Sequence, residues 1–213
     1  MIDYVGSGFS DHFESFGFSL DEHAASIAAV LDASCKEPVH LLGYSMDGAV
    51  TASLALLRPD LVARLVVCDR NLKPGGGEAS QRIAASDQTT FVAKDHPEWM
   101  NSLAKAATEV AALPSFLWAA RSGADPKGVY SNARALVDLA EDFEERFLAL
   151  VMEQPYVYGE QGFPGTTGKV TPDLPDPDLL RANCARTHIV PGVRHPMMID
   201  DPVATASVLG PLL

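Results

Sequence analysis

The sequence predicts an α/β fold with a mostly parallel sheet, flanking helices and one all-helical insertion. Short apolar segments at residues 39–42 and 65–68 are separated by a helical pattern. Apolar strands joined through a helix are typical of parallel pairing, because only a crossover of this kind connects parallel neighbours. From about residue 81 to residue 150 the pattern becomes helical with no clear strand, and strand-like segments return after it.

The first helix is predicted to begin after Ser19. Ser19-Leu20-Asp21-Glu22 is a capping box, in which the serine hydroxyl and the glutamate carboxylate each accept a backbone N–H at the helix start. Apolar positions then recur at helical spacing on one face, so this helix should pack one side against a sheet. These positions are Leu20, His23, Ala24, Ile27, Ala28 and Leu31.

The next elements are two buried strands with a helix between them. Val39-His40-Leu41-Leu42 is bounded by proline and glycine and has the length of a buried strand. A helix is expected from about Met46 to Leu57, ending before Pro59. Leu65-Val66-Val67-Cys68 then predicts the second strand.

The remaining chain divides into an insertion and a return to the core. Within 81–150, breaks at Pro97, Pro114 and 123–126 separate several helices. We therefore expect residues 1–80 and 151–213 to form the core, with 81–150 inserted into it.

Two further strands are predicted at 156–158 and 188–190. A loop rich in proline and glycine, from 162 to 177, separates them. Asp200-Asp201-Pro202 opens the closing helix, because proline suits a first helical turn.

The charge and composition of the chain disfavour several classes of partner. Sixteen Lys and Arg against 28 Asp and Glu give a net charge of −12, and the pI is near 4.8, which disfavours nucleic acid and anionic membranes as partners. No stretch of 18 apolar residues exists, and residues 1–9 lack the pattern of a signal peptide. Cys35, Cys68 and Cys184 fit neither a disulfide framework nor a zinc site. We expect a soluble, cytoplasmic protein.

One segment carries a candidate nucleophile. Gly43-Tyr44-Ser45-Met46-Asp47-Gly48 lies between a predicted strand and a predicted helix, where a nucleophile elbow belongs. The helix would direct free N–H groups at the Ser45 hydroxyl, and the Met46 N–H is the candidate oxyanion donor. The alternative is an ordinary strand-to-helix turn in which Ser45 only caps the helix.

Four segments in this order resemble the α/β-hydrolase family: 3–11, with its Gly-x-Gly and Ser-Asp; 38–48, with the elbow; 59–62, with the following turn; and 191–202, with His195. The resemblance implies that the insertion takes the place of the family's cap. It also implies a core truncated at its amino terminus, without the family's first strands and without the loop that supplies a second oxyanion N–H.

His195 is the candidate general base. It follows a short strand and a Pro-Gly turn, so its imidazole can reach over the sheet edge toward Ser45. The other histidines have no predicted nucleophile beside them and are interpreted as surface or core residues. They are His12, His23, His40, His96 and His188.

Two carboxylates compete to orient His195. Asp69 ends the strand after the elbow helix and resembles the acid of hydrolases that carry it at this strand end. Glu160 follows the next core strand, although Gly162 occupies the usual acid position there. Asp69 is favoured, and either choice gives the order Ser, acid, His. The alternative for both is a structural carboxylate paired with an arginine such as Arg70.

The sequence therefore predicts a serine hydrolase that cleaves a small ester or related acyl substrate through an acyl-enzyme intermediate, with no cofactor and no metal. Aromatic and apolar residues of the insertion would line an acyl pocket: Phe91, Trp99, Phe116, Leu117 and Trp118.

Alternatives remain open. Asp47 stands where the family's elbow normally has glycine, and one oxyanion donor is expected to be missing. The chain could instead be an inactive or partner-completed fragment, or a carbon–carbon bond hydrolase or perhydrolase on the same fold. An exposed sheet edge beside the first strand would favour a homo-oligomer.

Overall fold

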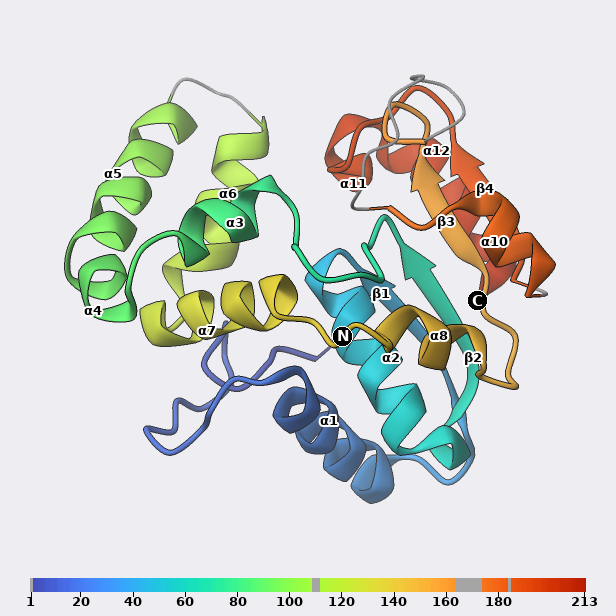
Figure 1. The fold of residues 1–213 in the computed structure, drawn as a ribbon. Coiled ribbons are helices and arrows are strands. Elements are labelled where there is room, and N and C mark those ends of the chain that lie inside the picture. The colour runs from blue at the N-terminus through green and yellow to red at the C-terminus, as the bar shows by residue number, and fades with distance from the viewer. Residues whose placement is uncertain (1, 109–111, 164–173, 184) are drawn as a thin grey trace.

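The computed structural model describes residues 2–108, 112–163, 174–183 and 185–213. Its centre is a parallel sheet in which the described strands follow one another in the order β1-β2-β3-β4, confirming the predicted fold class (Figure 1). The strands are β1 (Val39–Tyr44), β2 (Val62–Cys68), β3 (Tyr156–Gly159) and β4 (Thr187–Val190).

Parallel pairing brings all carboxyl ends of the strands to one edge of the sheet. Tyr44 lies opposite Cys68 at the ends of β1 and β2, and Gly159 lies opposite Val190 at the ends of β3 and β4. Ser45, Asp69 and Glu160, each of which directly follows a strand, therefore share this edge. β1 pairs on one side only among the described residues, and self-association through it stays a prediction.

Helices α1 (Leu20–Ser34) and α2 (Met46–Leu57) begin where the sequence predicts. The capping box is formed, with Glu22 N donating to Ser19 Oγ at 3.2 Å and Ser19 N donating to Glu22 Oε2 at 3.0 Å. The apolar face of α1 is buried as predicted. From Gly48 to Ala55 every residue of α2 is buried, because this helix packs between α1 and the sheet.

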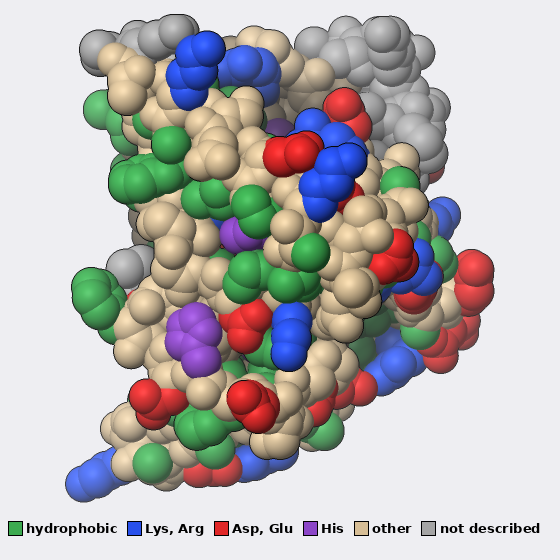
Figure 2. Space-filling model, turned by 90° about the vertical axis from the view of Figure 1, so that its left-hand side faces the viewer, with side chains coloured by type: hydrophobic (Ala, Val, Ile, Leu, Met, Phe, Trp, Pro, Cys, Tyr) green, Lys and Arg blue, Asp and Glu red, His purple; other side chains and the backbone are tan. Residues whose placement is uncertain are grey.

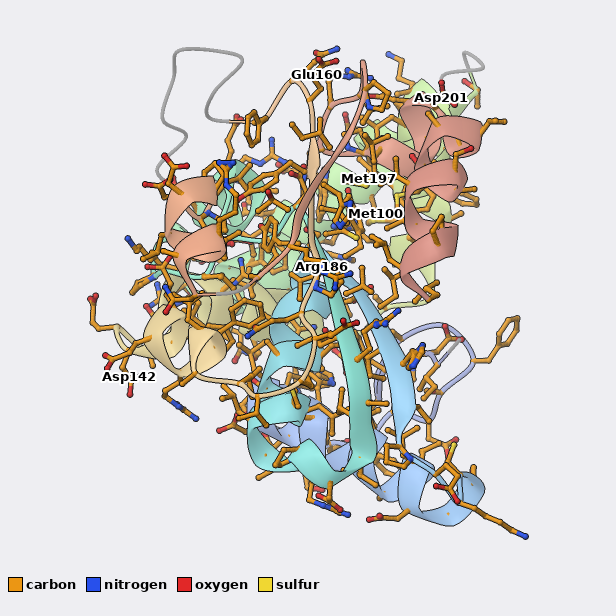
Figure 3. The ribbon with its side chains drawn as sticks, turned by 90° about the vertical axis from the view of Figure 1, so that its right-hand side faces the viewer. Met100, Asp142, Glu160, Arg186, Met197 and Asp201 are labelled. Carbon is orange, nitrogen blue, oxygen red and sulfur yellow. The ribbon has the colours of Figure 1, made fainter. Side chains whose placement is uncertain are left out.

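Helices cover both faces of the sheet. One face carries α1, α2, α8 (Phe143–Leu148) and α10 (Pro177–Ala182), which join the larger apolar core. The other face carries α11 (Met197–Asp200) and α12 (Pro202–Leu209), which pack on Val66, Val157 and Val190. Figure 3 shows the strands between these two layers.

Between β2 and β3 the described residues form helices joined by turns and loops, with an isolated β-bridge at Glu153 and no strand. The helices from residue 78 to residue 137 lie beside the sheet in Figure 1. Pro114 and Pro126 each lie near the start of a helix, where a missing N–H costs no intrahelical bond. At Pro97 the predicted break is wrong: a π segment (Phe91–Asp95) runs directly into the helix His96–Ala107, and no gap separates them. The elements between β2 and β3 are α3 (Glu78–Ala84), α4 (Gln88–Thr90), a π turn (Phe91–Asp95), α5 (His96–Ala107), α6 (Ala112–Ser122), α7 (Pro126–Val137) and α8.

The insertion has a small core of its own but is not separate from the sheet domain. Ile83, Phe91 and Ala133 form a local cluster, whereas Leu136 and Phe147, from its last helices, belong to the main core. The division at residues 81 and 150 stays a prediction, and packing places α8 with the core.

Other sequence predictions have mixed outcomes. The short helices α10 and α11 were not predicted, because four to six residues carry too little periodicity. Most of the predicted 162–177 loop, and Cys184, lie outside the described residues, and Cys35 and Cys68 are free thiols. No helix of the described chain has the length and apolarity needed to cross a bilayer.

Candidate active site

Ser45 occupies a strained turn between β1 and α2. Its φ is 53° and its ψ is −121°, a left-handed conformation that a residue with a Cβ adopts at a cost of about 1–3 kcal/mol. Two backbone bonds hold the turn: Ser45 N donates to Cys68 O at 3.0 Å, and Gly48 N donates to Ser45 O at 3.0 Å. The Ser45 side chain makes no helix-capping bond, which argues against the interpretation of Ser45 as only a cap.

Glycines make this turn possible. A Cβ at Gly43 would lie 2.2 Å from Thr51 Oγ1 and 2.6 Å from Asp47 O, and a Cβ at Gly48 would lie 3.0 Å from Arg70 Cβ. The backbone of β1 therefore packs directly against the first turn of α2. This close approach directs the Ser45 side chain away from the sheet.

His195 lies against the serine. Its Nε2 is 3.0 Å from Ser45 Oγ, and its side chain is 52% exposed. Tyr44 contacts His195 in two ways. Its phenol donates to His195 O at 2.9 Å, and the centres of the two rings lie 5.0 Å apart. This role of Tyr44 was not predicted, although the residue stands inside the elbow motif.

The loop that carries His195 is tied down on both sides. Arg194 donates from its backbone N to Asp200 Oδ2 at 2.8 Å and from Nε to the same oxygen at 2.9 Å. These bonds from Arg194 lower the pKa of the Asp200 carboxyl. On the other side, Gly192 N donates to Glu160 Oε2 at 2.6 Å.

Asp69 completes a chain of contacts. Its Oδ2 lies 3.0 Å from His195 Nδ1, and its Oδ1 accepts from Gly159 N at 3.3 Å. The side chain is only 2% exposed. Asp69 also has a positive φ of 48°, and the next residue is held by the Tyr156 hydroxyl, which accepts from Arg70 N at 2.7 Å and donates to Arg70 O.

The structure thus brings Ser45, His195 and Asp69 together and places Glu160 elsewhere. Figure 3 shows Glu160 beyond the end of β3, where it bonds the His195 loop through Gly192 and not the imidazole.

Asp47, which stands where the family's elbow normally has glycine, has a hydrogen-bond partner in Tyr4. Asp47 is half-buried beside Ser45, and burial raises the pKa of its carboxyl, while a hydrogen bond from Tyr4 opposes this shift. Burial and Asp47 together raise the pKa of the Tyr4 phenol, which therefore remains a donor. A carboxylate thus fits in the elbow because the amino-terminal segment supplies its partner.

The proposed oxyanion donor is placed where its N–H has no intrahelical acceptor. Met46 is the first residue of α2, and the first N–H groups of a helix find no carbonyl four residues earlier within it. Its role in binding an oxyanion stays a prediction.

The predicted pocket residues divide into two groups. Phe91 is 3% exposed and packs with Tyr130 and His96 inside the insertion, so it is a core residue and not a pocket wall. Phe116 and Trp118 on α6 are exposed, and Trp99 is half-buried. A cavity of about 410 Å³ formed by residues such as His12, Phe13 and Phe16 includes none of the predicted catalytic residues.

A serine on an elbow, a carboxylate at the next strand end and a histidine from the last loop, in this chain order, define the α/β-hydrolase class. The family model for the alpha/beta hydrolase fold matches residues 1–150. The chain belongs to this family.

A curated protein is similar to part of the sequence, and solved structures are similar in fold. The lipase LipV of Mycobacterium tuberculosis is 35% identical over 68 residues, a match that covers 32% of this chain and 26% of the lipase, about a quarter of its length. An esterase from Exiguobacterium antarcticum superposes with a TM-score of 0.70 at 18% identity, over 96% of this chain and 77% of the esterase. The enol-lactonase of Burkholderia xenovorans gives 0.69 at 15% identity, over 96% and 76%.

Proposed function

We propose that the protein is a serine hydrolase that cleaves a small carboxylic ester or related acyl substrate through an acyl-Ser45 intermediate. The observation that carries this proposal is the continuous contact from Ser45 Oγ to His195 Nε2 and from His195 Nδ1 to Asp69, at 3.0 Å each.

The contacts suit one distribution of protons. With the proton of the imidazole on Nδ1, His195 donates to Asp69 and accepts the Ser45 hydroxyl proton at Nε2. As Ser45 Oγ attacks the carbonyl carbon, this proton moves to His195, and Asp69 stabilises the imidazolium. His195 then returns the proton to the leaving alcohol as the acyl–oxygen bond breaks.

A second half-reaction releases the acid. His195 takes a proton from water, the resulting hydroxide attacks the acyl carbon, and the proton returns to Ser45 Oγ as the ester bond to the enzyme breaks. In both halves the negative charge on the carbonyl oxygen would be stabilised by the Met46 N–H at the start of α2.

The related proteins support this reaction class. Their names describe an esterase, a lipase and an enol-lactonase, and all three act on an acyl–oxygen bond. The contact of Asp69 with His195, and the separate bond of Glu160 to Gly192, support Asp69 as the orienting acid.

Labelling with a fluorescent fluorophosphonate tests the proposal, because this probe reacts only with an activated serine. We expect the wild type to be labelled, and Ser45→Ala and His195→Gln to lose labelling. Asp69→Asn should reduce the labelling rate by about 10³- to 10⁴-fold.

Two variants serve as matched controls. Glu160→Gln removes the rival carboxylate, and His188→Gln removes a histidine of β4 outside the contact chain; both should label at rates close to wild type. An unlabelled wild type that is folded by circular dichroism would instead support the inactive-fragment alternative.

A further inference from the structure

Asp69 contacts His195 from an unfavourable backbone conformation. Its φ is 48°, in the left-handed region that a residue with a Cβ occupies only where its surroundings hold it there. Charged side chains of both signs are scattered over the face seen in Figure 2, whereas the Asp69 side chain is only 2% exposed. The contacts that fix this carboxylate therefore come from the interior of the fold.

Strand β3 supplies contacts to Asp69 and to the residue after it. Asp69 N donates to Val157 O at 2.8 Å, and Gly159 N donates to Asp69 Oδ1 at 3.3 Å. The third contact comes from a side chain, because the Tyr156 hydroxyl accepts from Arg70 N at 2.7 Å and donates to Arg70 O. One strand thus holds the amide of Asp69, its carboxylate and the backbone of the next residue.

The Tyr156 hydroxyl is itself firmly placed. Its ring is fully buried in the main core, and its centre lies 4.6 Å from the centre of the Tyr158 ring. Burial raises the pKa of the Tyr156 phenol well above its usual value, so the hydroxyl keeps the proton that it donates to Arg70 O. Because one hydroxyl bonds both polar backbone groups of Arg70, it limits rotation of the chain immediately after Asp69.

We propose that Tyr156 is a positioning residue for the orienting acid: its hydroxyl holds the peptide after Asp69, so that the carboxylate stays against His195. This inference rests on the proposed function and adds a residue to its machinery. Without the hydroxyl, the turn can relax toward a negative φ, and the Asp69 carboxylate then moves away from the imidazole. A displacement of about 1 Å at a reacting group costs on the order of 10²-fold in rate.

Tyr158 provides a matched control on the same strand. It is also fully buried, and its hydroxyl donates to Pro175 O at 2.8 Å, ahead of α10. Phenylalanine at either position removes one hydroxyl from the same core, but only Tyr156→Phe releases the turn at Asp69. Both variants should remain folded by circular dichroism.

Steady-state kinetics with 4-nitrophenyl butyrate tests the role, with kcat expressed per active site counted by fluorophosphonate titration. Tyr156→Phe should lower kcat by roughly 10- to 100-fold and change KM by less than about twofold, because both half-reactions use His195. Tyr158→Phe should stay within about twofold of the wild type in both quantities. Equal kcat values for the two variants, or a Tyr156→Phe chain that does not fold, would overturn the positioning role.

A double-mutant cycle shows whether the hydroxyl acts through the carboxylate. In an Asp69→Asn background, Tyr156→Phe should lower kcat by less than about twofold, because the carboxylate that the hydroxyl positions is already lost. The same loss of kcat in both backgrounds would mean that the hydroxyl affects the site in another way, and the inference would be wrong.

The position of the His195 proton separates this inference from the proposed function, because it is measured without turnover. In Ser45→Ala, nitrogen NMR of the imidazole should show the proton on Nδ1, where Asp69 accepts it. Adding Tyr156→Phe should shift the proton toward Nε2, the nitrogen that a free neutral imidazole favours, and adding Tyr158→Phe should not. If this difference is observed but no ester is cleaved, the positioning role stands and the hydrolase proposal fails. A proton that stays on Nδ1 in both variants counts against the positioning role.

Discussion

A Cβ added to Gly162 would lie 3.9 Å from Asp69 Oδ1. Gly162 follows β3 and Asp69 follows β2, so the segments after two neighbouring strands approach each other at the carboxylate that contacts His195. The φ of Gly162 is outside the left-handed region, and the nearest atom to its added Cβ is a Leu174 side-chain carbon at 3.4 Å. A side chain can therefore be introduced there at little steric cost.

This relationship predicts that the orienting carboxylate can be moved. Asp69→Gly, which also suits the positive φ of that residue, should lower kcat/KM for a neutral ester by about 10³- to 10⁴-fold. Adding Gly162→Asp should recover at least tenfold, because the new carboxylate enters the space that Asp69 leaves. Steady-state kinetics with 4-nitrophenyl butyrate measures both.

The control is Asp69→Gly with Gly162→Asn. This pair restores volume and polarity without charge, and it should recover no activity. Equal recovery by Asp and Asn at position 162 would mean that space filling, not a carboxylate, restores His195.

The choice between Asp69 and Glu160 shows which part of the site can be predicted from the sequence and which part cannot. Both residues were predicted to follow core strands of a mostly parallel sheet, because the strands and their pairing follow from local apolar patterns. Which carboxylate faces the imidazole depends on how the β4 loop packs. Glu160 is bonded to Gly192 in that loop, a contact between residues 32 apart that no local pattern encodes.

Other parts of the site lay beyond the sequence for the same reason. The Tyr4 bond to Asp47 and the Tyr44 bond to the His195 carbonyl join segments far apart in the chain. The aromatic residues of the insertion were also ambiguous, since Phe91 and Trp118 look alike in an amphipathic pattern. Packing buries the first and exposes the second.

Because Ser45 has a positive φ, a glycine at this position should make the fold more stable than alanine does, while it removes the nucleophile. Ser45→Gly should unfold with a free energy about 1 kcal/mol higher than Ser45→Ala, because only glycine relieves the positive φ of 53°. Both variants lack the nucleophile and should be inactive. Urea denaturation compares them.

The same pair of substitutions at Ser26, inside helix α1, provides the control. There glycine should be about 0.5–1 kcal/mol less stable than alanine. A glycine variant of Ser45 that is also less stable than the alanine variant would show that the turn is not strained.

The Asp47 carboxyl should reduce the stability of the fold at high pH. Burial raises the pKa of its carboxyl in the folded protein above 3.8, so the folded state holds this proton to higher pH than the unfolded state. Stability from this group is lost as the pH rises through the raised pKa. Asp47→Asn should therefore stabilise the protein at pH 8, on the order of 1 kcal/mol, and by less at pH 4.

Thermal denaturation at the two pH values measures this effect, and Asp32→Asn is the control. Bonds from Arg58 lower the pKa of Asp32, so that variant should lose stability at pH 8. An Asp47→Asn variant with the same change in melting temperature at both pH values would argue against a pH-dependent cost from the buried carboxylate.

The buried His23 imidazole should reduce the stability of the fold at low pH. It is fully buried in α1 against Tyr4 and Phe16, and its Nε2 lies 3.0 Å from Asn132 Oδ1 in α7. Burial lowers the pKa of His23 below 6.5, and the bond to Asn132 opposes this only in part. The unfolded chain therefore takes up a proton below pH 6.5 that the folded chain resists.

The free energy of unfolding should consequently fall as the pH drops below 6.5, by at most about 1.4 kcal/mol per pH unit from this group. His23→Gln should reduce the slope of the free energy of unfolding against pH. A smaller slope should remain, because burial also lowers the pKa values of His96 and His188. His12→Gln, at an exposed histidine, is the control in urea denaturation at pH 5, 6 and 7. Because His23 joins α1 to α7, a slope unchanged by His23→Gln would mean that the contact between core and insertion does not limit stability in acid.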